Sequence, residues 1–168
     1  MKRTATHIDP LALPASLQPY LHKARIYDSS CSETARTLYL EGELKAFLKI
    51  AEPGKLAREE LMTRFLHAHG LAPGVIEYVS NGGHDYLLTE ALDGEDGIAE
   101  RHLTEPVRLA GIFGESLRLI HSLPIEQCPI PARTAEMITA SETNIGRGYK
   151  DPAIITEDIS LAARQLDR

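Results

Sequence analysis

Short runs of apolar residues, each long enough for one β-strand, dominate the first half of the chain after the N-terminal segment. The runs cover residues 24–27, 35–40, 44–50, 75–79 and 85–89. Glu41-Gly42-Glu43 separates the second run from the third, and Ser80-Asn81-Gly82-Gly83-His84 separates the last two. Both separators have the composition of turns between antiparallel strands. The pattern therefore predicts an antiparallel sheet built largely from hairpins.

Helical periodicity appears between the strands and takes over after them. Residues 55–69 place Met62, Phe65 and Leu66 on one face, and Gly70 ends the segment. Residues 106–123 carry a longer apolar stripe, formed by Leu109, Ile112, Phe113, Leu117, Ile120 and Leu123. Weaker helical segments are predicted at 133–142 and 159–166. A strand-rich part followed by a helix-rich part predicts an α+β fold, in layers or in two lobes.

Composition narrows the class of protein. The chain has 168 residues, of which 43% are hydrophobic and 25% charged, as in an ordinary globular domain. Its net charge of −6 argues against a general nucleic-acid-binding protein. No apolar run approaches the ~18 residues that a membrane span needs, so we expect no membrane partner. Cys31 and Cys128 do not form a disulfide framework, which favours a cytoplasmic location.

Lys49 is the first candidate for chemistry, because it interrupts the apolar run Phe47-Leu48-Lys49-Ile50. By strand alternation it shares a face with Phe47, and a lysine on an inward face needs a partner. A position on an edge strand or an outward face is the simpler alternative for a lone lysine. Glu59 lies about 70° from the centre of the apolar stripe of the following helix, within reach of the sheet. Glu60 lies almost opposite that stripe, so we expect a Lys49–Glu59 pair and an exposed Glu60.

The loop Asp28-Ser-Ser-Cys-Ser-Glu33, between the first two strand runs, is a second candidate. Small hydroxyl side chains and backbone amides in such a loop can face a phosphate group. The loop contains no glycine, and a plain solvated loop is the simpler interpretation from these residues alone.

Several motifs in a fixed order resemble the N-terminal part of an aminoglycoside 3′-phosphotransferase, a family of the protein-kinase-like superfamily. They are Phe-Leu-Lys-Ile at 47–50, Arg58-Glu59, the run from Gly70 to Ile76, Leu-Leu-Thr-Glu at 87–90, Gly94-Glu-Asp-Gly97, Phe113-Gly-Glu-Ser-Leu-Arg118 and Gln127-Cys-Pro129. The resemblance covers residues 24–130. It implies a protein-kinase-like fold, with a five-stranded antiparallel N-lobe and one helix at 1–91. A hinge and an incomplete helical C-lobe would follow at 92–168.

The resemblance also assigns roles to residues. Lys49 would bind the α- and β-phosphates of ATP, and Glu59 would hold Lys49. Leu88 would line the adenine pocket, and Thr89, Glu90 and Ala91 would form the hinge, with the Thr89 carbonyl and the Ala91 amide meeting adenine. The nucleotide-positioning loop would contain Ser29, Ser30 and Ser32. The acidic residues Glu157 and Asp158 would receive a cationic aminoglycoside.

The chain departs from the family pattern in its catalytic loop. The family has His-Gly-Asp, followed by an Asn, and a later Asp as second metal ligand, and no His-Gly-Asp occurs in this sequence. His84-Asp85 lies in a predicted hairpin, which is the wrong context. No catalytic residue and no ligand for the Mg²⁺ that accompanies ATP is therefore assigned. The chain ends at Arg168, before that loop is expected, and is interpreted as a fragment, an interrupted gene or one piece of a longer protein.

Three functions remain open from the sequence. The first is an ATP-dependent aminoglycoside O-phosphotransferase, an antibiotic-resistance kinase represented here by its nucleotide-binding half and inactive on its own. The second is a non-catalytic nucleotide-binding or interaction fragment, and the third is a related small-molecule kinase with another acceptor. The apolar stripe of residues 106–123 would lack its usual cover in a helical C-lobe, so the isolated chain is expected to be marginally stable, to aggregate or to hide this face by self-association.

Overall fold

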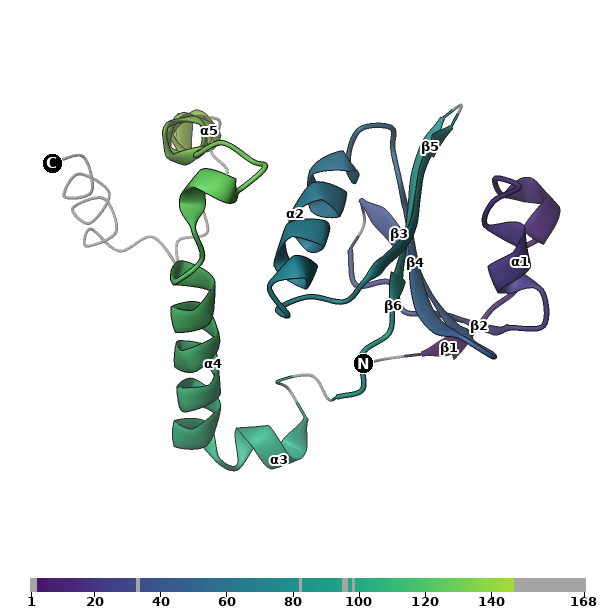
Figure 1. Cartoon of the computed structure of the whole chain (residues 1–168), viewed down its shortest axis with the longest axis horizontal. Coiled ribbons are helices and arrows are strands. Elements are labelled where there is room, and N and C mark those ends of the chain that lie inside the picture. Colours follow the sequence, from purple (N-terminus) through teal and green to yellow (C-terminus); the bar gives the residue numbers. More distant parts are fainter. Residues whose placement is uncertain (1–2, 33, 82, 95–96, 98, 147–168) are drawn as a thin grey trace, which may run out of the picture. The chain divides into compact units, whose positions relative to one another are not determined.

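The computed structural model describes residues 3–146, except residues 33, 82, 95, 96 and 98. It contains two compact units, Met1–Ile130 and Pro131–Arg168, each of which is described by itself. The first unit contains the whole sheet and most of the helices (Figure 1). The boundary expected between residues 91 and 92 falls inside this unit and stays a prediction.

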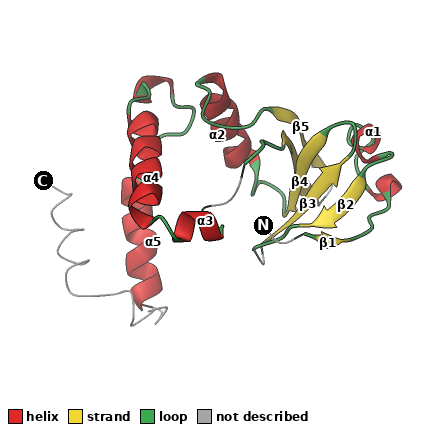
Figure 2. Ribbon diagram, turned by 90° about the horizontal axis from the view of Figure 1, so that it is seen from below, coloured by secondary structure: helices red, strands yellow, loops and turns green. Residues whose placement is uncertain are grey.

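The sheet has six antiparallel strands in the order β1-β2-β3-β4-β6-β5. Figure 2 shows β1, β2, β3 and β4 following one another across the sheet. Their bounds are Thr4–Ala5 for β1, Arg25–Asp28 for β2, Ala35–Glu41 for β3, Lys45–Ala51 for β4, Val75–Asn81 for β5 and His84–Glu90 for β6. The kinase-like α+β fold is confirmed, but the expected number of five strands is corrected to six. The additional strand is β1, whose two residues pair with Asp28 and Tyr27. So short a strand has no alternation by which the sequence could reveal it.

Strand pairing sorts the side chains of the sheet into two faces. Thr37, Lys49 and Leu87 lie opposite one another on β3, β4 and β6, and the next row contains Leu38, Leu48 and Leu88. Because successive side chains point to opposite faces, the first row faces one side of the sheet and the second row faces the other. The three leucines of the second row are completely buried.

The N-terminal segment covers the face that carries those leucines. It folds into a short 3₁₀ turn, η1, at Pro10–Ala12 and into α1 at Gln18–Leu21. Leu13, Leu17 and Leu21 of this segment are buried against the sheet leucines and form the main hydrophobic core. In Figure 1, α1 and α2 lie on opposite faces of the sheet.

Helix α2, at Ala57–Ala68, covers the face that carries Lys49. Leu56, immediately before the helix, is buried with Ala51 and Leu87 in a second, smaller core. The helix ends before Gly70, whose φ of +72° is a left-handed conformation that glycine adopts without a side-chain clash. The helix predicted at 55–69 is thus confirmed, with its first residues in the preceding turn.

The remaining helices follow the sheet in sequence. They are α3 at Glu100–Leu103, α4 at Pro106–His121 and a 3₁₀ turn, η2, at Ile125–Gln127, and the second unit contributes α5 at Thr134–Gly146. The segment 159–166 lies outside the described residues. Among the helices of the described part, none has both the length and the hydropathy to cross a membrane.

Candidate functional site

The centre of the candidate site is an ion pair between Lys49 and Glu59. The Nζ atom of Lys49 donates a hydrogen bond to Oε2 of Glu59 at 2.6 Å. Lys49 lies on β4, which has a neighbouring strand on each side, so the alternative of an edge position is excluded. Both side chains are partly exposed, at 33% for Lys49 and 44% for Glu59, and thus accessible to a ligand. The predicted contact is confirmed.

Glu60 corrects the second half of that prediction. It forms an ion pair with Arg64, but its side chain is only 12% exposed, less than that of Glu59. The negative charge of Glu60 also acts on Tyr78 of β5, where it adds to burial and to Asp85 in raising the pKa of the phenol. Glu60 therefore faces β5 and is not a fully solvated residue, because α2 packs close enough to that strand to shield its first turn.

Two hollows on this face share Ser32, Lys49 and Glu59 and are parts of one cleft. The larger hollow, of about 930 Å³, continues past the ion pair to the start of α2, and its other charged or titratable lining residues are Arg36, Glu52, Lys55 and His84. The smaller hollow, of about 400 Å³, continues along the sheet and is also lined by Ser29, Cys31, Thr37, Phe47, Leu87 and Thr89. We refer to the two together as the Lys49 cleft.

The serine loop forms one wall of this cleft. Ser29 is buried, and its N–H donates to the Thr37 carbonyl at 2.9 Å. Ser30 Oγ accepts the Thr37 N–H at 3.0 Å, and the Ser30 N–H donates to Asp28 Oδ1 at 2.9 Å. The Ser30 backbone and hydroxyl, helped by Arg36, hold the pKa of Asp28 below its usual value. These bonds fix the base of the loop, whereas Ser32 is exposed at the cleft.

Leu88 does not occupy the expected position. It is completely buried in the main core on the other face of the sheet, among Leu38 and Leu48. Leu87, one residue earlier, lines the Lys49 cleft together with Phe47. Both leucines are apolar, so composition does not show which of them faces which side. Pairing with Lys49 decides the question for Leu87.

The segment predicted to be the hinge, residues 89–91, forms hydrogen bonds with neighbouring parts of the chain. Thr89 lines the cleft, as the resemblance implies. The Ala91 N–H, expected to meet adenine, instead donates to the Lys45 carbonyl at 3.0 Å. Glu90 exchanges two hydrogen bonds with Gly74, one through its carboxylate at 3.1 Å and one through its N–H at 2.9 Å. The Ala91 N–H is therefore not free to meet a ligand, and one oxygen of the Glu90 carboxylate is already bonded to Gly74.

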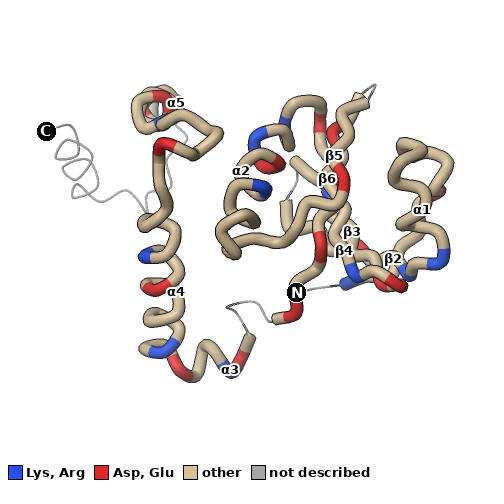
Figure 3. The backbone as a smooth tube through the Cα atoms, in the orientation of Figure 1, with Lys and Arg blue, Asp and Glu red and all other residues tan. Residues whose placement is uncertain are grey.

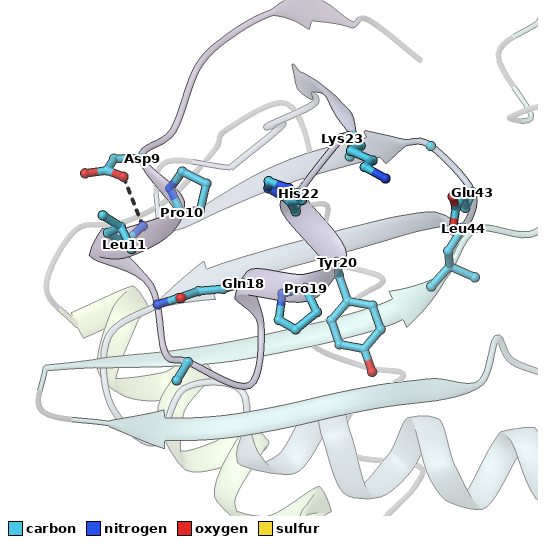
Figure 4. Close-up of a pocket in the computed structure, with 13 residues that line it drawn as sticks. Asp9, Pro10, Leu11, Gln18, Pro19, Tyr20, His22, Lys23, Glu43 and Leu44 are labelled. Carbon is cyan, nitrogen blue, oxygen red and sulfur yellow. Dashed lines mark hydrogen bonds between the residues drawn. The ribbon is translucent and has the colours of Figure 1, made fainter.

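A third hollow, also of about 930 Å³, lies on the face of the sheet opposite to the Lys49 cleft, between α1 and the turn after β3 (Figure 4). Its lining includes Pro10, Pro19, Tyr20 and Leu44. In Figure 4 the Asp9 carboxylate, which also lines the hollow, accepts a hydrogen bond from the backbone N–H of Leu11 at 3.0 Å. The pairing of a lysine with a carboxylate that marks the Lys49 cleft is not found among the interactions of these lining residues.

The family of the chain follows from a comparison of its sequence with protein-family models. The model of the phosphotransferase enzyme family matches residues 25–164, which include the serine loop, Lys49, Glu59 and β6. The chain belongs to the phosphotransferase enzyme family.

Curated relatives agree with this membership. A protein named probable aminoglycoside 3′-phosphotransferase, from Lactococcus lactis subsp. lactis (strain IL1403), is 35% identical over 131 residues, 78% of this chain and 50% of the relative. The aminoglycoside 3′-phosphotransferase of Niallia circulans is 30% identical over 124 residues, 72% of this chain and 47% of the relative. That of Streptomyces fradiae is 28% identical over 97 residues, 57% of this chain and 36% of the relative. The predicted resemblance is confirmed, and the chain spans about half the length, or less, of these relatives.

Two expected parts of a phosphotransferase site are not described. Glu157 and Asp158, expected to receive the acceptor, lie outside the described residues. Within the described ranges, no group of three His, Cys, Asp or Glu side chains is arranged to hold a metal ion. No step through a metal is therefore derived from the described residues.

Proposed function

We propose that the Lys49 cleft binds the nucleotide of an ATP-dependent phosphotransferase. The observation that carries the proposal is the 2.6 Å contact between Lys49 Nζ and Glu59 Oε2 inside a cleft walled by the serine loop. A strand lysine oriented by a helix glutamate is the arrangement that places a lysine on nucleotide phosphates. Membership of the phosphotransferase enzyme family supports the same role.

The charges of the cleft suit a triphosphate. Arg36, Lys49 and Lys55 line its larger hollow, next to the Ser30 and Ser32 hydroxyls. Figure 3 shows basic and acidic positions close together along α2. In this proposal Glu59 limits the freedom of the Lys49 side chain, so that its ammonium group meets the α- and β-phosphates. Exposed serine-loop groups supply further hydrogen bonds.

The smaller hollow would take the nucleoside. Phe47, Leu87 and Thr89 give it one aromatic, one aliphatic and one polar wall, a combination that suits a flat heterocyclic ring. Leu87 replaces Leu88 in this role. If the Ala91 N–H meets adenine, it must first release the Lys45 carbonyl.

The acceptor in this proposal is an aminoglycoside, because the relatives are named aminoglycoside 3′-phosphotransferases. In the reaction, the γ-phosphorus forms a bond to a sugar hydroxyl oxygen and loses its bond to the oxygen that bridges it to the β-phosphate; that oxygen leaves as part of ADP, and the hydroxyl proton passes to water. A kinase with a different acceptor is the alternative, since the cleft concerns the nucleotide alone. A cytoplasmic location is part of the same proposal and is supported by the two unpaired cysteines, Cys31 and Cys128.

A calorimetric titration of the 168-residue chain with ATP, which measures the affinity, tests the proposal. We expect weak binding, reduced about tenfold or more in Lys49→Met, because a hydrogen bond to a charged group contributes about 1.5–3 kcal/mol. Lys45→Met is the matched control, because Lys45 lies on the same strand but pairs with Asp93. Equal affinities for the three chains would contradict the proposal.

Turnover separates nucleotide binding from catalysis. We expect the 168-residue chain not to phosphorylate kanamycin-type aminoglycosides, since its sequence contains no His-Gly-Asp. Transfer of labelled γ-phosphate to the antibiotic, lost in Lys49→Met, would contradict this expectation.

We also propose that the chain self-associates through α4. Ile112, Phe113, Leu117 and Ile120 on this helix are 44–56% exposed. A continuous apolar stripe of this kind is typical of a surface that contacts another protein surface.

A further inference from the structure

Asp85 is a completely buried carboxylate that lies next to the Lys49 cleft without lining it. It belongs to β6, where it pairs with Ala51 and precedes Leu87 by two residues. Its side chain therefore lies on the face of the sheet that α2 covers. A buried carboxylate is costly unless hydrogen bonds compensate for the loss of water, so its contacts identify its role.

The main contact of Asp85 is with the start of α2. Its Oδ2 atom accepts the backbone N–H of Leu56, the N-cap residue, at 2.9 Å. A leucine side chain cannot satisfy the free N–H groups of a helix start, and Leu56 provides no side-chain cap. A carboxylate at this end of a helix is also favoured by the helix dipole. Asp85 thus stabilises the first turn from a neighbouring strand.

Leu56 is fixed from both sides. Its side chain is buried with Ala51 and Leu87, and its carbonyl accepts the Glu60 N–H at 2.8 Å. The residue therefore joins the sheet to the first turn of the helix. Glu59 belongs to that turn, three residues after Leu56. A shift of Leu56 would move Glu59 relative to β4, which carries Lys49.

We propose that Asp85 is a positioning residue, which holds Leu56 and thereby sets Glu59 at contact distance from Lys49. Its relevance to nucleotide binding rests on the proposed function, but the effect on Lys49 does not. The other oxygen, Oδ1, has no hydrogen-bond partner within the described residues. The negative charge of the Asp85 carboxylate is nevertheless favoured by polar groups nearby, which include the Tyr78 and Ser80 hydroxyls.

The reactivity of Lys49 tests this proposal without any nucleotide. An amine held in an ion pair is acylated slowly by acetic anhydride, and peptide mass spectrometry measures the rate at each lysine. We expect Asp85→Asn to raise the rate at Lys49 severalfold, towards that of Glu59→Gln, with Lys45 unchanged. Val75→Ala, which removes apolar contact from the same small core, is the matched control and should leave Lys49 unchanged.

A double variant decides whether Asp85 acts through Glu59. If it does, adding Asp85→Asn to Glu59→Gln raises the Lys49 rate no further, because the contact is already lost. Multiplied effects, or an effect of Val75→Ala equal to that of Asp85→Asn, would overturn the proposal.

Hydrogen exchange in the unmodified chain provides a second measurement, in case Asp85→Asn does not fold. We expect the Leu56 amide to exchange at least tenfold more slowly than the Ala57 and Arg58 amides of the same helix start. Equal exchange of the three amides would overturn the proposal. A chain that passes both tests but does not bind ATP would retain the positioning role and lose the proposed function.

Discussion

At Lys49, the ion pair with Glu59 orders a side chain that remains accessible to a ligand. Exposed ion pairs contribute little to stability, about 0–1 kcal/mol, so their value here is geometric. The sequence predicts this pair because a lysine interrupts an apolar strand and one helix position reaches it. It does not predict the partial burial of Glu60, which depends on how closely α2 packs against β5.

The sequence does not identify Asp85 as a structural residue. His84-Asp85 is similar to part of a catalytic motif, and a position in a hairpin does not indicate complete burial. The hydrogen-bond partner that explains the burial of Asp85 is the Leu56 N–H, which is 29 residues away in sequence. A contact of this kind follows from the packing of a helix on a sheet, not from local pattern.

The charge of Asp85 makes stability depend on pH. Burial raises its pKa, but the Leu56 N–H and other polar groups outweigh burial and lower the pKa below the usual value of 3.8. A carboxyl with a lowered pKa stabilises the folded state above pH 3.8, and this contribution is lost as the pH falls through the folded pKa. Tyr78 of β5 is a titratable neighbour of Asp85, and its own pKa is raised by burial and by the charge of Asp85.

We therefore expect Asp85→Asn to lower the free energy of unfolding by about 1–3 kcal/mol at pH 7 and to flatten its decline in acid. Urea unfolding between pH 7 and pH 3 measures both effects. Asp93→Asn, whose side chain is 97% exposed in the parent chain, should keep the parent profile. Parallel profiles for the parent and Asp85→Asn would contradict the assignment.

At the scale of elements, successive side chains of β6 have different roles, because one side of the strand faces the Lys49 cleft and the other faces the main core. The sequence contains adjacent leucines, and only pairing with β4 shows that Leu87 faces the cleft and Leu88 the main core. The hairpins were predictable because their turns and alternation are local. The two-residue β1 and the engagement of the Ala91 amide were not, because both depend on main-chain contacts with other segments.

Alanine variants test this division. Leu88→Ala should lower the free energy of unfolding by about 2–5 kcal/mol, because it opens a cavity in the main core. The ATP affinity of its folded fraction should stay unchanged. Leu87→Ala should reduce both stability and ATP affinity, as measured by urea unfolding and calorimetry. A loss of ATP affinity in Leu88→Ala, with unchanged affinity in Leu87→Ala, would contradict the orientation of β6.

At the scale of the whole molecule, α4 presents an apolar surface to solvent. Leaving roughly 400 Å² of such surface in water forgoes about 10 kcal/mol at ~25 cal/mol per Å², which is comparable with the free energy of unfolding of a whole domain. The sequence stripe predicts this face, but it does not identify the surface that covers it.

We expect sedimentation velocity to show concentration-dependent self-association of the 168-residue chain. Phe113→Glu and Leu117→Glu should weaken it, because a charge in an apolar contact is costly. Val107→Glu is the matched control, because Val107 is 86% exposed on another side of the same helix. A monodisperse monomer at all concentrations would contradict the expectation.

The most direct test of the central claim is a map of amide chemical shifts in the ¹⁵N-labelled chain during titration with ATP. The account predicts that the largest changes occur in the Lys49 cleft, at Ser30, Ser32, Phe47, Lys49 and Thr89. The hollow between α1 and the turn after β3 provides an internal control, because it lies on the other face of the sheet. Changes confined to that hollow, or none at saturating ATP, would contradict the assignment of the Lys49 cleft as the nucleotide site.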